Sequence, residues 1–190
     1  MNPREFAICL VVALVPVLHG CVPAVVAGGT AAVLVADDRR SSGAMLDDES
    51  IERNTNKRIK EKYGDRVHVD VTSYNRFVLL VGEVPSQEIK DDIGAIALGV
   101  ENVRNVQNDL TIEALASTST SANDAYLTGM VKTRFAGQKT FQPNQVKVVT
   151  EDGVVYLMGL VTHKEGDAAA EVASTTSGVQ KVVKVFGYID

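Results

Sequence analysis

The sequence of 190 residues has few aromatic residues and few cysteines. Aromatic residues make up 5% of it, tryptophan is absent, and the two cysteines are Cys9 and Cys21. Two cysteines 12 positions apart in an apolar N-terminus provide neither a disulfide framework nor the spacing of a metal site. The net charge of −5 argues against a nucleic-acid binder, which would carry a basic face. A hydrophobic content of 45% is enough for a packed core.

Catalytic motifs are also lacking. The sequence contains no HExxH, P-loop or GxGxxG pattern and no Ser/His/Asp arrangement. His68 alternates with valines, which predicts an outward-facing strand residue, and His163 follows a predicted strand end. The acidic clusters at 37–38, 47–49 and 91–92 are expected to be solvated loops or helix starts. We therefore expect a binding protein, with no catalytic residues, no cofactor and no metal.

An apolar run of 13 residues, FAICLVVALVPVL, occupies positions 6–18. This length is typical of the hydrophobic part of a signal peptide and is short of the roughly 20 residues that span a bilayer. The alternative is one long membrane helix, because residues 22–36 are also apolar. Pro16 and Pro23 would interrupt such a helix, at a cost of about 3 kcal/mol each.

The residues that follow the apolar run, Leu18-His19-Gly20-Cys21, resemble the bacterial lipoprotein lipobox, in which the cysteine is acylated. This resemblance implies a signal peptide over 1–20, lipidation at Cys21 and a lipidated flexible tether over 21–46. Several acyl chains would hold the protein on a membrane far better than one chain. Val22 stands after the cysteine, where an aspartate would signal inner-membrane retention, so the expected location is the outer membrane.

The remainder of the chain is an internal repeat of two 67-residue segments, 47–113 and 124–190, joined by a Ser/Thr/Ala-rich linker over 114–123. The motif "VLLVG" at 78–82 corresponds to "VYLMG" at 155–159, an offset of 77. The motif "GVENV" at 99–103 corresponds to "GVQKV" at 178–182, an offset of 79. The difference in length falls in connections, as expected for a structural repeat.

Each segment is predicted to fold in the order αββαβ, as a three-stranded mixed sheet covered by two helices. Apolar residues at i+4 spacing predict the first helix, from Ile51 to Tyr63 in one copy and from Leu127 to Phe135 in the other. Asp124 is expected to cap the second of these helices. The Asp-Gly pair at 152–153 predicts a tight hairpin. The fold class is therefore α+β, with two tandem domains.

This element order, the apolar strand that ends in glycine and the "GV..V" before the last strand resemble the BON domain of bacterial envelope proteins. Together with the lipobox and the tether, they resemble the dual-BON outer-membrane lipoproteins, including division-site lipoproteins. The resemblance implies a periplasm-facing, lipid-anchored protein that maintains envelope integrity. It also implies binding of anionic phospholipid through the first helix of the second domain.

The first helix of the second domain carries a second apolar ridge opposite its core stripe. This ridge comprises Tyr126, Met130, Thr133 and Gly137, and it is flanked by Lys132 and Arg134. A tyrosine at the edge of an apolar ridge bordered by cations suits a membrane interface. Charge supports this assignment, because the first copy carries a net −5 and the second a net 0.

Two other uses of the ridge remain open. The ridge could pack against the first domain or the linker. It could also bind a protein partner, which would make the chain an adaptor for outer-membrane assembly or for the cell-wall or division machinery.

Overall fold

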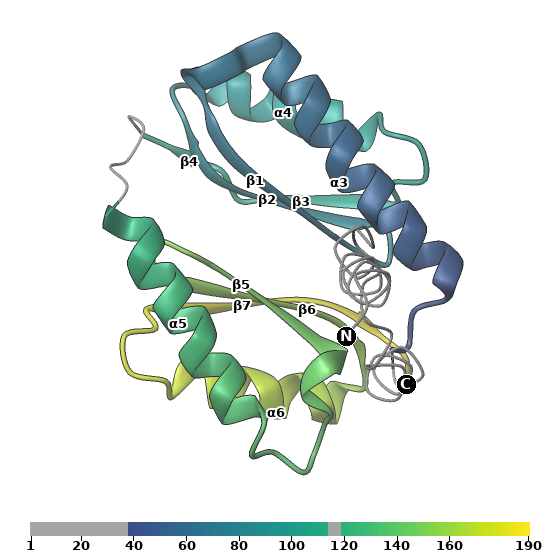
Figure 1. The fold of residues 1–190 in the computed structure, drawn as a ribbon, viewed down its shortest axis with the longest axis vertical. Helices are drawn as coiled ribbons and strands as arrows, with labels where there is room; N and C mark the ends of the chain where they lie inside the picture. The colour runs from purple at the N-terminus through teal and green to yellow at the C-terminus, as the bar shows by residue number, and fades with distance from the viewer. Residues whose placement is uncertain (1–37, 114–118) are drawn as a thin grey trace, which may run out of the picture. The chain divides into compact units, whose positions relative to one another are not determined.

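The computed structural model describes residues 38–113 and 119–190, and the segment Asp37–Asp190 forms one compact unit. Two successive αββαβ repeats build this unit (Figure 1). The predicted signal peptide, Cys21 and most of the predicted tether lie outside the described residues, as does the first half of the predicted linker. Within the described ranges, none of the helices has the length and hydropathy needed to cross a membrane.

The first repeat folds as a mixed sheet with helices on one face. Its elements are α3 (Ser42–Tyr63), η2 (Gly64–Arg66), β1 (His68–Tyr74), β2 (Phe77–Val84), α4 (Gln87–Leu98), β3 (Asn105–Asn108) and β4 (Thr111–Ile112). β1 pairs antiparallel with β2, and both β3 and β4 pair parallel with β2. β3 and β4 keep one register along β2, so they are the two parts of the single predicted last strand.

The second repeat has the same order with a continuous last strand. Its elements are α5 (Ser119–Phe135), η3 (Pro143–Gln145), β5 (Val146–Glu151), β6 (Val154–Val161), α6 (His163–Ser174) and β7 (Lys181–Tyr188). β5 pairs antiparallel with β6, which pairs parallel with β7. The predicted α+β class and the two tandem αββαβ domains are confirmed.

Each sheet has one face packed against its own two helices. Every fourth residue of α3 from Ile51 to Tyr63 is buried, and so are Leu127, Val131 and Phe135 of α5. Both helical stripes therefore face the core, as the i+4 spacing predicts. The side chains of α4 and α6 complete the two cores.

The opposite faces of the two sheets contribute to a third apolar cluster that both repeats share. Its buried members are Tyr74, Leu79, Val81, Tyr156, Met158 and Val185. The central strands β2 and β6 are therefore buried on both faces. Strands buried on both faces read as continuous apolar runs, and this explains why "VLLV" and "VYLM" do not alternate.

Both first helices begin earlier than expected. α3 starts at Ser42, inside the predicted tether, and the hydroxyl of Ser41 accepts a 3.1 Å hydrogen bond from the backbone N–H of Ala44. α5 starts at Ser119, inside the predicted linker. A serine cap and a Ser/Thr/Ala run carry no apolar periodicity, so the spacing of core residues could not reveal these first turns.

A buried carboxylate from each first helix holds the hairpin turn of its repeat. Asp48 accepts hydrogen bonds from the backbone N–H groups of Asn75 (2.7 Å) and Arg76 (2.6 Å), and Asp124 accepts from those of Asp152 and Gly153. Two predictions are therefore wrong. The 47–49 cluster is not wholly solvated, because Asp48 is buried, and Asp124 lies within α5 rather than at its N-cap.

The hairpin turns explain why these carboxylates are needed. The two central residues of each turn have positive φ, 53° and 68° at Asn75 and Arg76, and 46° and 73° at Asp152 and Gly153. This is the pattern of a type I′ turn, whose twist matches that of the paired strands. Its N–H groups point to the helix side, where the carboxylate satisfies them. The Asp-Gly prediction of a tight hairpin is confirmed.

Candidate functional site

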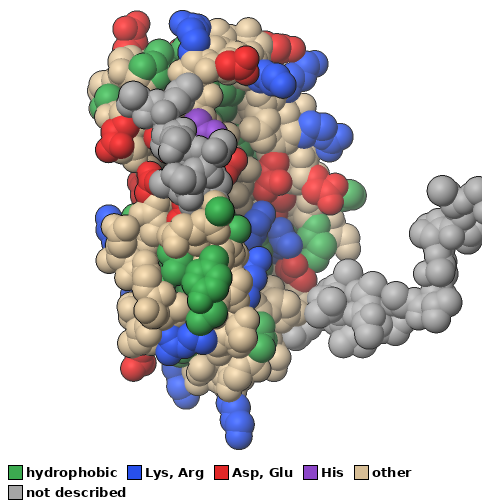
Figure 2. All heavy atoms as spheres, turned by 60° about the vertical axis from the view of Figure 1, so that its left-hand side comes forward, with side chains coloured by type: hydrophobic (Ala, Val, Ile, Leu, Met, Phe, Trp, Pro, Cys, Tyr) green, Lys and Arg blue, Asp and Glu red, His purple; other side chains and the backbone are tan. Residues whose placement is uncertain are grey.

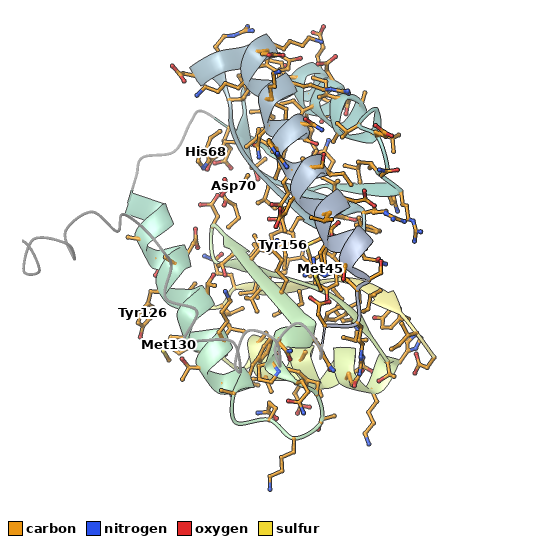
Figure 3. All side chains as sticks on the ribbon, turned by 45° about the vertical axis from the view of Figure 1, so that its right-hand side comes forward. Met45, His68, Asp70, Tyr126, Met130 and Tyr156 are labelled. Atoms are coloured by element: carbon orange, nitrogen blue, oxygen red, sulfur yellow. The ribbon has the colours of Figure 1, made fainter. Side chains whose placement is uncertain are left out.

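Tyr126 and Met130 lie on the outer face of α5, opposite the buried stripe. The side chains of Tyr126 and Met130 are 62% and 36% exposed. Figure 3 shows both pointing away from the sheet of the second repeat. In the space-filling view, hydrophobic side chains gather over α5 with basic side chains nearby (Figure 2). The predicted ridge is therefore an accessible surface of the described structure.

Thr133 and Gly129 continue this face between and beyond the two large side chains. The Thr133 hydroxyl donates a 2.8 Å hydrogen bond to the carbonyl oxygen of Gly129, so its methyl group and backbone contribute the outward surface. A Cβ added at Gly129 would meet no heavy atom within 4 Å. Gly137 stands two residues beyond the last residue of α5, so the helical spacing does not extend to it.

The two predicted cations, Lys132 and Arg134, differ in how firmly their side chains are held. Lys132 is exposed on α5. The Arg134 guanidinium, in contrast, is tied to the C-terminal end of α6. Its Nη1 donates to the carbonyl oxygen of Val172 (2.9 Å) and to the hydroxyl of Thr176 (2.7 Å), and its Nη2 donates to the hydroxyl of Thr175 (3.0 Å). Arg134 thus joins the two helices of the second domain, a role that its position in the sequence does not indicate.

The exposure of this face argues against the alternative in which the ridge packs against the first domain. Tyr126 and Met130 are exposed beside the described residues of the first repeat, so that repeat covers neither of them. The domains instead meet through the shared apolar cluster and through polar contacts at its margin. One of these is the ion pair between Lys147 Nζ and Glu52 Oε1, at 3.1 Å.

A clamp at the end of the predicted tether was not predicted from the sequence. Arg39 donates from Nη1 and Nη2 to the two carboxylate oxygens of Glu165, at 2.7 and 2.8 Å, and Nη1 also donates to the carbonyl oxygen of Leu160. These hydrogen bonds, with those from Thr162 at the start of α6, lower the pKa of Glu165 to about 2. Residue 39 lies 126 positions from Glu165, so spacing gave no signal of this pair.

Arg40 anchors the same segment to the first repeat. Its guanidinium bonds to the carboxylates of Asp38 and Asp48 and lies 4.1 Å from the centre of the Tyr74 ring. The two arginines at 39 and 40 therefore hold the start of the folded unit against both repeats.

Comparison with known proteins places these features in a family. The model of the BON domain matches residues 47–114 and residues 123–188, one match for each αββαβ repeat. The chain belongs to the BON domain family. The expected end of the central strand at its glycine is wrong, because β2 and β6 each continue for two residues beyond Gly82 and Gly159. These glycines, and the glycine-valine pairs before the last strands, lie at equivalent places in the two BON domains.

Three relatives of known name are similar to this chain. The outer membrane lipoprotein DolP of Haemophilus influenzae is 41% identical over 175 residues, which cover 91% of each chain. The 21 kDa hemolysin of Actinobacillus pleuropneumoniae is 30% identical over 80% of this chain and 79% of its own. The osmotically-inducible protein Y of Escherichia coli is 31% identical over 60% of this chain and 58% of its own.

These similarities confirm the class and location expected from the sequence. The chain is a dual-BON lipoprotein of the outer membrane, and its similarity to DolP runs through both BON domains and beyond them. The matched family and the named relatives indicate a binding protein, and none of them indicates a catalytic family. The predicted acylation of Cys21 lies outside the described residues and stays a prediction.

Proposed function

We propose that this outer-membrane lipoprotein faces the periplasm and maintains envelope integrity by binding anionic phospholipid through α5 of its second BON domain. The observation that carries the proposal is the exposed pair Tyr126 and Met130, one turn apart on the face of α5 that the core does not use. Neither side chain belongs to one of the apolar core clusters, yet both are large and mainly apolar.

The chemistry of this face suits the boundary between headgroups and acyl chains. A tyrosine ring resides at headgroup depth, with its hydroxyl in water, and the flexible methionine reaches the first acyl carbons. Lys132 on the same helix can meet a lipid phosphate, and each cation near an anionic surface contributes about 1 kcal/mol. Arg134 adds fixed positive charge beside the face while holding α6.

The charge distribution favours docking through the second domain. With seven basic and seven acidic residues, the segment 124–190 is neutral, whereas 47–113 carries nine basic and 14 acidic residues. An anionic bilayer repels the first domain and leaves the second free to approach. The difference in net charge between the two domains therefore favours approach of the second domain to the membrane without an additional basic patch.

Sedimentation of residues 37–190 with vesicles tests the proposal without the lipid anchor. Phosphatidylglycerol vesicles are expected to carry the protein down, phosphatidylcholine vesicles are not, and binding should weaken as salt rises. Tyr126→Ala and Lys132→Glu should each reduce binding by about tenfold while leaving the circular dichroism spectrum unchanged.

Matched controls on the first domain make the test specific. Leu46→Ala removes an equally exposed apolar side chain from α3, and Lys57→Glu makes the same charge change on that helix. Both controls should bind like the wild type. If the wild type ignores anionic vesicles, the same face serves a protein partner, and the adaptor function in envelope assembly or division takes the place of lipid binding.

A further inference from the structure

Three potential metal ligands converge where the two BON domains meet. His68 at the start of β1 is the direct cross-strand partner of Glu83 in β2. Glu151, the last residue of β5, comes from the second domain. One ligand atom from each of these three side chains lies within 4.8 Å of the other two. Figure 3 labels His68 and its strand neighbour Asp70 near the β5–β6 hairpin.

The arrangement follows from the alternation of side chains along the strands. Val69 and Val71 of β1 pack toward the helices of the first domain, so His68 and Asp70 point to the other face. On β2, Val81 belongs to the shared cluster, and Glu83, two residues on, lies on that same face. Glu151 likewise shares the face of Val149, which packs against the shared cluster.

We infer that His68, Glu83 and Glu151 form a binding site for a divalent transition-metal ion of the zinc type, which joins the two BON domains. One imidazole nitrogen and two carboxylate oxygens make three protein ligands, and a water completes a tetrahedron. The imidazole favours zinc-type ions over Ca²⁺ and Mg²⁺, which prefer all-oxygen sites. Ligands of one zinc ion lie roughly 3.5 Å apart, so small side-chain rotations close the observed spacing.

The charge balance of the cluster fits a dication. Glu83 is 3% exposed and is the one charged residue of β2. Carboxylates are common ligands of zinc-type ions, and the two of this cluster offset a charge of +2.

The internal repeat shows that the fold does not require these ligands. The turn residues 75–76 and 152–153 are equivalent, an offset of 77, so His68 corresponds to Gln145 and Glu83 to Leu160. The second domain builds the same two strands with neither ligand at these positions. The cluster is therefore a feature of the first domain's sheet, completed by the second domain, and it is separate from the exposed face of α5.

Zinc binding by the full chain tests the inference. Both cysteines are changed to serine so that no thiol binds metal, and the protein is purified in detergent and stripped with a chelator. Equilibrium dialysis against Zn²⁺ is expected to show one saturable equivalent per chain. Glu151→Gln and His68→Gln should each weaken this binding by about 100-fold or more, beyond the 10- to 100-fold typical of outer-shell changes.

A control and a second measurement separate metal binding from misfolding. Glu101→Gln removes one exposed carboxylate elsewhere in the first domain and should bind Zn²⁺ like the parent chain. Zn²⁺ should raise the thermal unfolding midpoint of the parent and not that of Glu151→Gln, since ligation stabilises only the state that binds. Absence of saturable binding in the parent, or equal affinity in the folded ligand variants, would overturn the inference.

Discussion

The carboxylate of Asp124 accepts a buried 2.9 Å hydrogen bond from the backbone N–H of Gly153, and so ties the first helix of the second BON domain to its hairpin turn. The other carboxylate oxygen accepts from the N–H of Asp152, at 3.0 Å. Asp48 makes the equivalent contacts in the first domain, so the device is repeated. It couples a helix to a turn 28 residues away.

Removal of this carboxylate should destabilise the second domain. Asp124→Ala orphans two backbone donors and should lower the free energy of unfolding by about 1–3 kcal/mol. Asp124→Asn keeps one acceptor oxygen and should lose less. Urea unfolding of residues 37–190 measures both. The control Asp167→Ala alters an exposed carboxylate and should stay within about 0.5 kcal/mol of the wild type.

Close backbone approach requires the glycine at the third position from the end of β2. Gly82 has a φ of 113°, and a Cβ there would overlap the carbonyl oxygen of His68 on the paired strand. Gly82→Ala should therefore cost about 2 kcal/mol or more. Gly129→Ala is the contrasting control, because that glycine lies inside α5 with open space around it.

The two glycine variants should move stability in opposite directions. Alanine in an exposed helix interior is about 1 kcal/mol more favourable than glycine, so Gly129→Ala should raise the unfolding midpoint. Differential scanning calorimetry of the two variants beside the wild type measures both shifts. Equal shifts of one sign would contradict the assigned reasons for these glycines.

The ion pair between Arg39 and Glu165 should make stability depend on acid pH. The pKa of Glu165 is depressed to about 2 in the folded chain, against an ordinary value near 4.5. A carboxyl with a depressed folded pKa contributes its full stability above pH 4.5 and loses it as pH falls toward 2. The contribution is lost because the unfolded chain then takes up the proton more readily.

Arg39→Ala tests this dependence. At pH 7 the variant should unfold at lower urea than the wild type, and the gap should shrink between pH 4.5 and pH 2. Urea titrations at several pH values measure the gap. Lys57→Ala, which removes an exposed cation from α3, should give no gap of this kind. A gap that is constant with pH would show that the Arg39 contribution does not pass through Glu165.

Arg134 should affect stability more than membrane affinity. Its three hydrogen bonds cap the last turn of α6, and Arg134→Ala removes all of them, at an expected cost of about 1–3 kcal/mol. Arg134→Lys keeps the charge but not the planar fork, so it should restore little of that loss. Thermal unfolding measures both variants, with Lys132→Ala as the control that should change stability by less than about 0.5 kcal/mol.

Much of the architecture could be predicted because it rests on local periodicity. The i+4 stripe of α5, the Asp-Gly turn and the repeated apolar strand are all short-range patterns, and each predicted element exists in the structure. The exposure of Tyr126 and Met130 could also be predicted, since the positions opposite a core stripe on a helix face outward.

The sequence alone determined two αββαβ repeats and an apolar face on α5, because spacings of two to four residues encode both. The repeated motifs and their order carried the resemblance to the family. Tertiary structure alone decided the roles of four residues. The sequence predicts that Asp48 is solvated and that Asp124 caps a helix. It also predicts that Arg39 belongs to a tether and that Arg134 contacts lipid. Tertiary structure also brought together His68, Glu83 and Glu151 from two domains. Some of their partners lie as many as 126 residues away, and only the packing of sheets and helices brings such distant groups within hydrogen-bonding or ligand distance.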